Sequence, residues 1–192
     1  MNKKIFLNKL KESIASMQSL EKQTLQINKC INLLYKTLKN KNKILICGNG
    51  GSASQAEHFS TEFLVRLNKN INRRPLAIVP LAFNNSHLTA CSNDYSFNQI
   101  FSKTLEAVGK KNDCIITLST SGKSKNVLNA LKISRKMKIS SIGFFGANKI
   151  EKADINLYVG SKDTARIQEA HLFLGHFILN EVEKKLFKKN KK

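Results

Sequence analysis

The chain has 192 residues, enough for one domain that buries a hydrophobic core without disulfides. Its 33 Lys and Arg residues against 13 Asp and Glu residues give a formal net charge of +20. The basic residues are spread along the chain without interleaved aromatic residues, and no helix-turn-helix punctuation is visible, so a main role in binding nucleic acid is disfavoured. A positive field does favour an anionic small substrate.

Cysteine spacing and hydropathy bear on the compartment. The cysteines form no Cys-x-x-Cys pair, which favours reduced thiols over a zinc ribbon or a redox pair; they are Cys30, Cys47, Cys91 and Cys114. The amino-terminal stretch is interrupted by Asn8, Lys9, Lys11 and Glu12 before a signal-peptide core forms, and no run approaches the ~20 apolar residues that span a bilayer. We expect a cytoplasmic protein with neither a membrane nor a nucleic acid as its partner.

Residues 3–40 carry apolar side chains at helical spacing with no Gly or Pro, which predicts one or two long amphipathic helices. An apolar helical arm of this kind often packs on a partner subunit.

From Lys43 onward, short apolar runs alternate with polar turns and helical stretches, which indicates a parallel sheet with crossover helices. The five predicted strands are 44–47, 76–79, 114–118, 142–145 and 155–159, separated by lengths that suit one helix each. A final helix is expected from about Thr164 to Lys185. We expect one α/β domain over 1–192, with the helical arm at 1–40 and the α/β core and final helix at 41–188.

Two predicted strand-to-helix turns have the composition of an anion site. The glycine turn, Gly48–Ser52, follows the first strand, and the serine turn, Ser119–Ser124, follows the third and supplies four hydroxyls. Ligands of open parallel sheets bind at such turns, where backbone N–H groups at helix amino termini face the ligand. Ordinary helix capping needs only one hydroxyl, so we favour a phosphate.

The glycine turn also has a dinucleotide interpretation, because Gly48-x-Gly50-x-x-Ala53 approximates a nucleotide fingerprint. That fingerprint requires an acidic residue near the end of the next strand, and the segment 79–84 has none. We therefore discount a dinucleotide.

His58 and Glu62 are four apart on the predicted helix 53–66 and so lie on one face. Such a pair can bind a metal or transfer protons, although an isolated pair is more often a plain surface pair. The final helix adds Gln168, Glu169, His171 and His176, of which we expect His171 to be a packed or solvent-facing histidine; His87 has the same interpretation.

Four ordered blocks carry a family resemblance. CGNGGSxxxAxHFxxE at 47–62, TAxxNDxxF at 89–97, STSGxSxNV at 119–127 and TARIQExHxxxxH at 164–176 resemble the phosphoheptose isomerase branch of the sugar isomerase (SIS) domain family. Two departures are Lys123, where Asn is usual, and a short segment 146–153 without the usual double glycine.

The resemblance implies a homotetramer of three-layer α/β/α, flavodoxin-like subunits with active sites near subunit contacts. It implies conversion of D-sedoheptulose 7-phosphate to D-glycero-D-manno-heptose 7-phosphate through an enediol, the first step of heptose synthesis for envelope polysaccharide. The positions that match sugar-binding residues are Asn49, Gly50, Gly51, Asn93 and Asp94. Those that match phosphate-binding residues are Ser119, Thr120, Ser121 and Ser124. The match to the zinc-ligand set, one zinc per subunit, is His58, Glu62, Gln168 and His176, with Glu62 and His176 also the acid/base pair.

Three alternatives stay open. A non-catalytic SIS relative that binds a replication initiator would lack the equivalents of Glu62 and His176, and both are present. A sugar-phosphate sensor would need only the serine turn, and an isomerase of a hexose phosphate would use the same chemistry.

One geometric point concerns assembly. Gln168 and His176 are about 12 Å apart along one helix at 1.5 Å per residue, so one ion does not easily bind both. Either both side chains lean toward each other, or the site takes Gln168 and His176 from different subunits of a symmetric oligomer. We therefore expect an active site shared between subunits, with Glu62 and His176 also candidates for residues from different chains.

Overall fold

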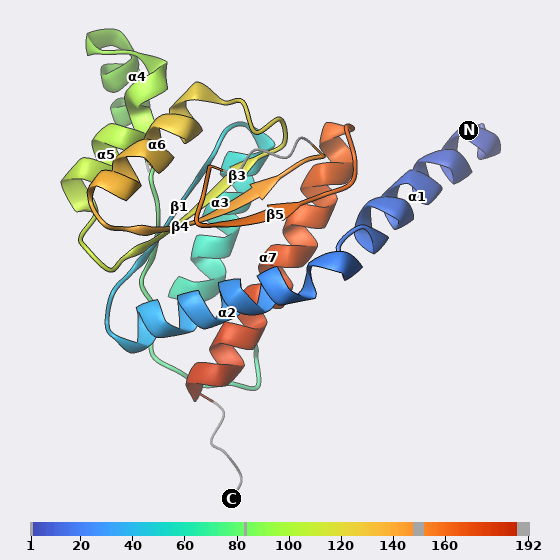
Figure 1. The fold of residues 1–192 in the computed structure, drawn as a ribbon, viewed down its shortest axis with the longest axis horizontal. Coiled ribbons are helices and arrows are strands. Elements are labelled where there is room, and N and C mark those ends of the chain that lie inside the picture. Colours follow the sequence, from blue (N-terminus) through green and yellow to red (C-terminus); the bar gives the residue numbers. More distant parts are fainter. Residues whose placement is uncertain (1, 83, 148–151, 188–192) are drawn as a thin grey trace, which may run out of the picture.

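The computed structural model describes residues 2–82, 84–147 and 152–187, which form a wholly parallel five-stranded sheet in the order β2-β1-β3-β4-β5 (Figure 1). The strands are β1 Ile44–Gly48, β2 Ile78–Pro80, β3 Cys114–Ser119, β4 Ser140–Phe145 and β5 Ile155–Tyr158. All five predicted strands are present. The second begins two residues later than predicted, because the N–H of Leu76 donates to the carbonyl of Phe63 at 3.1 Å rather than to the sheet.

The helices occupy most of the predicted positions. They are α1 Lys3–Gln18, α2 Thr24–Lys39, α3 Gly51–Leu64, α4 Asn85–Asp94, α5 Ile100–Val108, α6 Lys125–Lys136 and α7 Thr164–Phe187, with short 3-10 helices η1 Glu21–Gln23 and η2 Phe97–Gln99. The expectation of a helix between every pair of strands is not met after β4, where residues 146–147 and 152–154 are not helical. The rest of that connection, 148–151, lies outside the described residues and makes up half of the segment 146–153 that lacks the usual double glycine.

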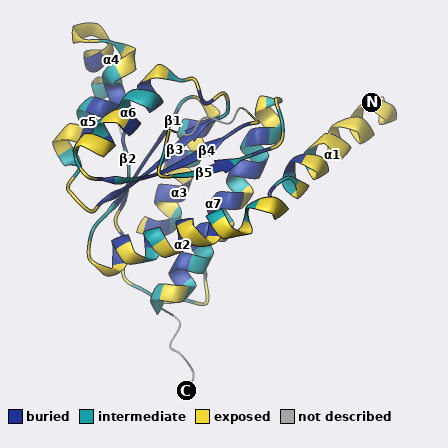
Figure 2. Cartoon of the chain, viewed as in Figure 1, coloured by how far each residue is buried: buried dark blue, intermediate teal, exposed yellow. Residues whose placement is uncertain are grey.

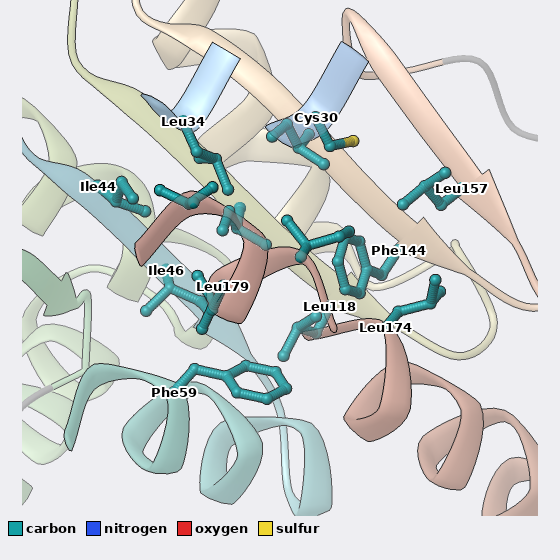
Figure 3. Packing of buried hydrophobic residues seen from close by; sticks show 14 of the residues in the cluster. Cys30, Leu34, Ile44, Ile46, Phe59, Leu118, Phe144, Leu157, Leu174 and Leu179 are labelled. Carbon is teal, nitrogen blue, oxygen red and sulfur yellow. The ribbon is translucent and has the colours of Figure 1, made fainter. Parts of the chain in front are cut away.

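Two hydrophobic cores make the three expected layers. One core lies between the sheet and α2, α3 and α7, and Figure 3 shows Ile44 and Ile46 of β1 beside Phe59 of α3 and Leu179 of α7. The other core takes the alternate β1 residues, Leu45 and Cys47, and packs them against α5 and α6. Alternation of buried side chains on both faces is the expected signature of a covered parallel sheet.

The predicted arm is two helices, α1 and α2, joined at η1. Helix α2 packs on α7, whereas α1 projects from the body (Figure 1) and is exposed along most of its length (Figure 2). The Ser13 hydroxyl donates to Glu169 at 2.7 Å, and Lys9 pairs with Asp163 at 3.3 Å. These contacts attach α1 to the beginning of α7.

The strand order places the glycine and serine turns side by side, because β1 pairs directly with β3 and both turns follow the carboxyl ends of their strands. In this topology the crevice between these strands is where open α/β sheets bind ligands. Within the described residues, no helix combines the length and hydropathy needed to cross a bilayer.

Candidate active site

The glycine turn opens α3 with a conformation that glycine adopts readily. Gly50 precedes the helix with φ of 54°. At Gly51 a Cβ would lie 2.7 Å from Nε2 of Gln168, so the absence of a side chain lets Gln168 of α7 approach the turn. Gly51, one of the two predicted sugar-binding glycines, therefore lies directly beside the predicted Gln168.

The serine turn opens α6 and is held by its own hydroxyls. The oxygen of Ser119 accepts from the N–H of Gly122 at 3.1 Å and donates to the hydroxyl of Ser124 at 3.3 Å. The Ser121 hydroxyl accepts from the N–H of Lys123 at 3.1 Å. Ser124 stands at the N-cap of α6 but makes no side-chain capping bond, so ordinary capping does not explain this hydroxyl.

An amide pair joins the two turns. Asn49 Nδ2 donates to Asn126 Oδ1 at 2.9 Å, and Asn126 Nδ2 donates back to Asn49 Oδ1 at 2.8 Å. Asn126 is buried and also accepts from the N–H of Val127 at 2.9 Å. The Asn49 side chain thus sets the spacing between the turns.

The third group, here called the His–Glu cluster, consists of His58 and Glu62 of α3 and His176 of α7. The Nε2 atoms of the two histidines are 2.7 Å apart, and Nε2 of His58 is 3.6 Å from Oε1 of Glu62. One ligand atom from each of the three residues lies within 4.8 Å of the others. A single chain therefore brings Glu62 and His176 together, which runs against the expectation that these two come from different subunits.

The electrostatics of the cluster favour neutral imidazole. Burial and the neighbouring His58 lower the pKa of His176 from its usual 6.5, while Glu62 opposes this by raising it. In the hydrogen bond between the two rings one nitrogen donates and the other accepts, so one ring presents an unprotonated nitrogen there. A neutral imidazole beside a carboxylate can accept a proton or bind a metal.

Metal binding fits this donor set. Two imidazole nitrogens and a carboxylate oxygen converge from two helices, and such ligands are typical of zinc. Gln168 is not beside them: it lies eight positions before His176 on α7, with its side chain against Gly51. The place of Gln168 in a metal site remains a prediction.

The predicted sugar-binding pair Asn93 and Asp94 is elsewhere. Asn93 Nδ2 donates to Asp94 Oδ1 at 2.9 Å, and both are exposed at the end of α4. Helix α4 packs on α5 and η2, over the opposite face of the sheet from α7 (Figure 1). Their role also remains a prediction.

The other two histidines have structural surroundings, as expected. His171 is fully buried, shares a 3.3 Å contact with the carbonyl of Phe145, and its burial lowers its pKa to about 4. His87 contacts the hydroxyl of Thr104 at 2.7 Å and so joins α4 to α5.

Two surface hollows lie beside these groups. One of about 230 Å³ is lined by Thr120 and Ser121 of the serine turn and by Ser161, Lys162 and Thr164 at the start of α7. Another of about 500 Å³ is lined by residues 67–70 and by Phe173, His176, Phe177 and Asn180 of α7. Thr120 and Ser121 of the serine turn and His176 of the His–Glu cluster thus each border a surface hollow.

Sequence reasoning missed two residues of this region. Gln55 donates from Nε2 to the carbonyl of Gln168 at 2.7 Å, and its spacing from His58 and Glu62, three and seven positions, is that of one helix face. Asn126 is part of the STSGxSxNV block but is not among the predicted site residues. The spacing could have identified Gln55, whereas the pairing of Asn126 with Asn49 depends on the sheet order.

Comparisons with known proteins agree with the family resemblance of the sequence. The SIS domain model matches residues 6–146. The chain is 47% identical over 154 residues to a phosphoheptose isomerase of Campylobacter concisus, covering 79% of this chain and 80% of that protein. It is 41% identical over 184 residues to a phosphoheptose isomerase of Aliarcobacter butzleri, covering 92% and 96%.

A solved structure agrees with the fold. The phosphoheptose isomerase GmhA of Neisseria gonorrhoeae superposes with a TM-score of 0.85 at 34% identity, covering 96% of this chain and all of that one, 100%. Family model, sequence relatives and structure all converge, and the chain belongs to the phosphoheptose isomerase branch of the SIS domain family.

Proposed function

We propose that this protein is a ketose–aldose isomerase that converts D-sedoheptulose 7-phosphate to D-glycero-D-manno-heptose 7-phosphate. The observation that carries the proposal is the His–Glu cluster, which places a carboxylate and a neutral imidazole together in a chain whose relatives are named phosphoheptose isomerases. The serine turn is the proposed phosphate site, because its hydroxyls lie at the amino terminus of α6, where Ser124 makes no capping bond and helix N–H groups suit a phosphate.

The reaction moves one proton between carbons and one between oxygens. The Glu62 carboxylate takes the proton from C1 of the ketose while an acid protonates the C2 carbonyl oxygen, which gives the enediol. Return of a proton to C2 and loss of the O1 proton give the aldose. His176 is the proposed group that passes a proton between the oxygens: its lowered pKa favours the neutral ring, whose unprotonated nitrogen can take the O1 proton, and the imidazolium formed can give that proton to the C2 oxygen.

The proposed cofactor is one zinc ion per subunit, held by His58, Glu62 and His176 of one chain, with Gln168 of a second subunit as the fourth predicted ligand. When bound, zinc would polarise the carbonyl and stabilise negative charge on the enediol oxygen. Incubation with a chelator, followed by measurement of zinc content and activity, tests this part. Unchanged metal content and activity after chelation of a zinc-loaded sample would count against it.

The sugar, we propose, reaches both the serine turn and the His–Glu cluster by binding across an interface of a homotetramer. Along α3, Gly51 is seven positions before His58 and eleven before Glu62, about 10 and 16 Å at 1.5 Å per residue. The cluster is therefore well separated, along the axis of α3, from the glycine turn of its own chain. A second subunit that supplies its turns to this cluster would complete the site.

Exposed apolar surface supports association. Ile5 is 60% and Phe6 53% exposed on α1, and the stacked rings of Phe173 and Phe177 on α7 are 52% and 44% exposed. These last two rings border the hollow beside His176. Asn93 and Asp94 on α4 are proposed to contact the sugar within such an assembly.

The direct test is incubation of the purified protein with sedoheptulose 7-phosphate and detection of a new aldose phosphate by NMR or by coupled oxidation. Parallel assays with fructose 6-phosphate test the hexose alternative. Binding of the heptose phosphate without turnover, under conditions where zinc is supplied, would favour a sensor instead.

Two further assignments complete the proposal. We place the enzyme in the cytoplasm, where thiols such as the four free and buried cysteines stay reduced. Its product would serve heptose synthesis for envelope polysaccharide, and accumulation of sedoheptulose 7-phosphate after deletion of the gene would test this role.

A further inference from the structure

A fully buried ion pair links the two helices of the His–Glu cluster. Nε of Arg73 lies 2.5 Å from Oε1 of Glu183, and neither side chain has any exposed surface. Arg73 lies in the connection between α3 and β2, and Glu183 lies in α7, seven positions after His176. Two helical turns separate positions seven apart, so Glu183 and His176 share one face of α7.

The other two nitrogens of the Arg73 guanidinium donate hydrogen bonds to the end of α3. Nη2 donates to the carbonyl of Glu62 at 3.0 Å, and Nη1 donates to the carbonyl of Phe63 at 2.8 Å. These carbonyls belong to the last turn of α3, where a helix lacks its own donors. The residue that we propose as the base is thus held through its own backbone by a cation anchored to the neighbouring helix.

The surroundings fix this guanidinium in place. Its plane lies near the rings of Phe63 and Phe187, with Cζ 5.6 and 6.0 Å from their centroids. The second oxygen of Glu183 accepts from the N–H of Asn68 at 3.0 Å, which also secures the loop that borders the hollow beside His176. Both oxygens of Glu183 are therefore used.

A contribution to folding stability does not by itself explain why a buried ion pair is present at this position. Removing two charges from water costs free energy that their attraction often fails to recover, and apolar residues of similar volume can replace a buried pair without loss. The planar guanidinium fork of Arg73 instead fixes the orientation of its partners, because it bonds a carboxylate and two carbonyls at set angles. Two further contacts between α3 and α7, Gln55 on the carbonyl of Gln168 and the ring of Phe59 against Gly175, lie nearer the start of α3.

We propose that Arg73 and Glu183 are positioning residues that hold Glu62 and His176 at their working separation. The inference concerns the geometry of the cluster and, for its effect on turnover, rests on the proposed isomerase function. Misplacement of a catalytic group by about 1 Å can cost about 100-fold in rate, so loss of the fork is expected to lower kcat by about 10- to 100-fold with little change in KM.

Two variants test it. Arg73→Lys keeps a cation for Glu183 but replaces the planar fork by a single ammonium, and Arg73→Met/Glu183→Leu removes both charges at similar volume. The control is Asp113→Asn, which removes the charge from the partly buried Lys43–Asp113 pair of 2.5 Å at the amino end of β3, the end of the sheet away from the turns. Thermal unfolding, kcat, KM and a crystal structure are measured for each folded variant.

Support requires lowered kcat with near-normal KM in both Arg73 variants, normal kcat in Asp113→Asn, and a crystal structure in which the His58 and His176 Nε2 atoms have moved from 2.7 Å. Wild-type kcat in Arg73→Lys, unchanged cluster geometry, or an equal loss of kcat in Asp113→Asn would each overturn the proposal. If the double variant does not fold, Arg73→Lys decides. If the wild-type protein lacks isomerase activity, the proposed function fails, and the cluster geometry in the variants still decides this inference.

Discussion

Gly175 of α7 lies directly against the ring of Phe59 on α3. A Cβ at position 175 would be 2.0 Å from Cζ of Phe59, a separation that no real side chain tolerates. Both residues are chain neighbours of cluster histidines: Phe59 follows His58, and Gly175 precedes His176. The close approach of α3 and α7 therefore depends on the absence of a side chain at this position.

Gly175→Ala should separate the two helices at the cluster. In an open helix this substitution is stabilising, but a clash with a buried ring costs about 1–3 kcal/mol and outweighs that gain. We expect a lower melting temperature and a lower kcat. The variant Gly175→Ala/Phe59→Leu, which makes room for the methyl group, should recover part of both; a Gly175→Ala protein as stable and as active as wild type would contradict this account.

Glu62→Gln should fold normally and lose isomerase activity by about 10²- to 10⁴-fold, because a positioned acid/base group contributes about that much. The amide keeps the size of the side chain but cannot take a proton from carbon. Steady-state kinetics and circular dichroism measure the two effects. Glu57→Gln, an exposed carboxylate of the same helix, is the control, and near-normal turnover in Glu62→Gln would remove Glu62 from the mechanism.

Ser121→Ala should weaken the binding of phosphorylated sugars by about 10- to 100-fold, since a hydrogen bond to a charged group contributes about 1.5–3 kcal/mol. The melting temperature should stay within a few degrees of wild type. The control is Ser134→Ala, whose hydroxyl bonds the carbonyl of Leu131 within α6 and is remote from the serine turn. Equal affinity in the wild-type and Ser121→Ala proteins would place the phosphate elsewhere.

Mixed oligomers test whether sites are shared between chains. Ser121→Glu places a negative charge in the serine turn, and Glu62→Ala removes the base. If the turns of one subunit serve the cluster of another, oligomers refolded from a mixture of these two variants contain some intact sites and regain activity. A mixture of Glu62→Ala and His176→Ala should stay inactive, because one chain brings those two residues together.

The interpretation of that experiment depends on subunit exchange, which mass spectrometry of the refolded mixture verifies. Mixed oligomers of Ser121→Glu and Glu62→Ala with no activity would assign both groups to a site within one chain. Recovery in the second mixture would instead return Glu62 and His176 to different subunits.

Buried His171 should make the protein sensitive to acid. Its pKa falls from 6.5 to about 4 in the folded chain, so between these values the unfolded chain binds a proton that the folded chain does not. The free energy of unfolding therefore decreases as the pH falls through this window, by about 1.4 kcal/mol per pH unit for this group. Its stabilising contribution is fully present above pH 6.5.

His171→Gln keeps a donor for the carbonyl of Phe145 but does not titrate. Chemical denaturation at several pH values between 4.5 and 7.5 should give a shallower loss of stability in this variant than in wild type. Parallel curves for the two proteins would exclude His171 as a source of acid sensitivity.

The sequence alone determined the strand runs, the two turns and the helical spacing of His58 and Glu62, because these depend on local periodicity and on residues close in the chain. Local periodicity could not supply the contact between His58 and His176, which joins residues 118 positions apart and which only the family resemblance had grouped as ligands of one metal. Nor could local periodicity supply the Asn49–Asn126 pair or the ion pair between Arg73 and Glu183. Each depends on the strand order β2-β1-β3-β4-β5, which sets α3 beside α7 and β1 beside β3. Helix geometry alone already separated Gln168 from His176, whereas only tertiary packing placed the Gln168 side chain against Gly51.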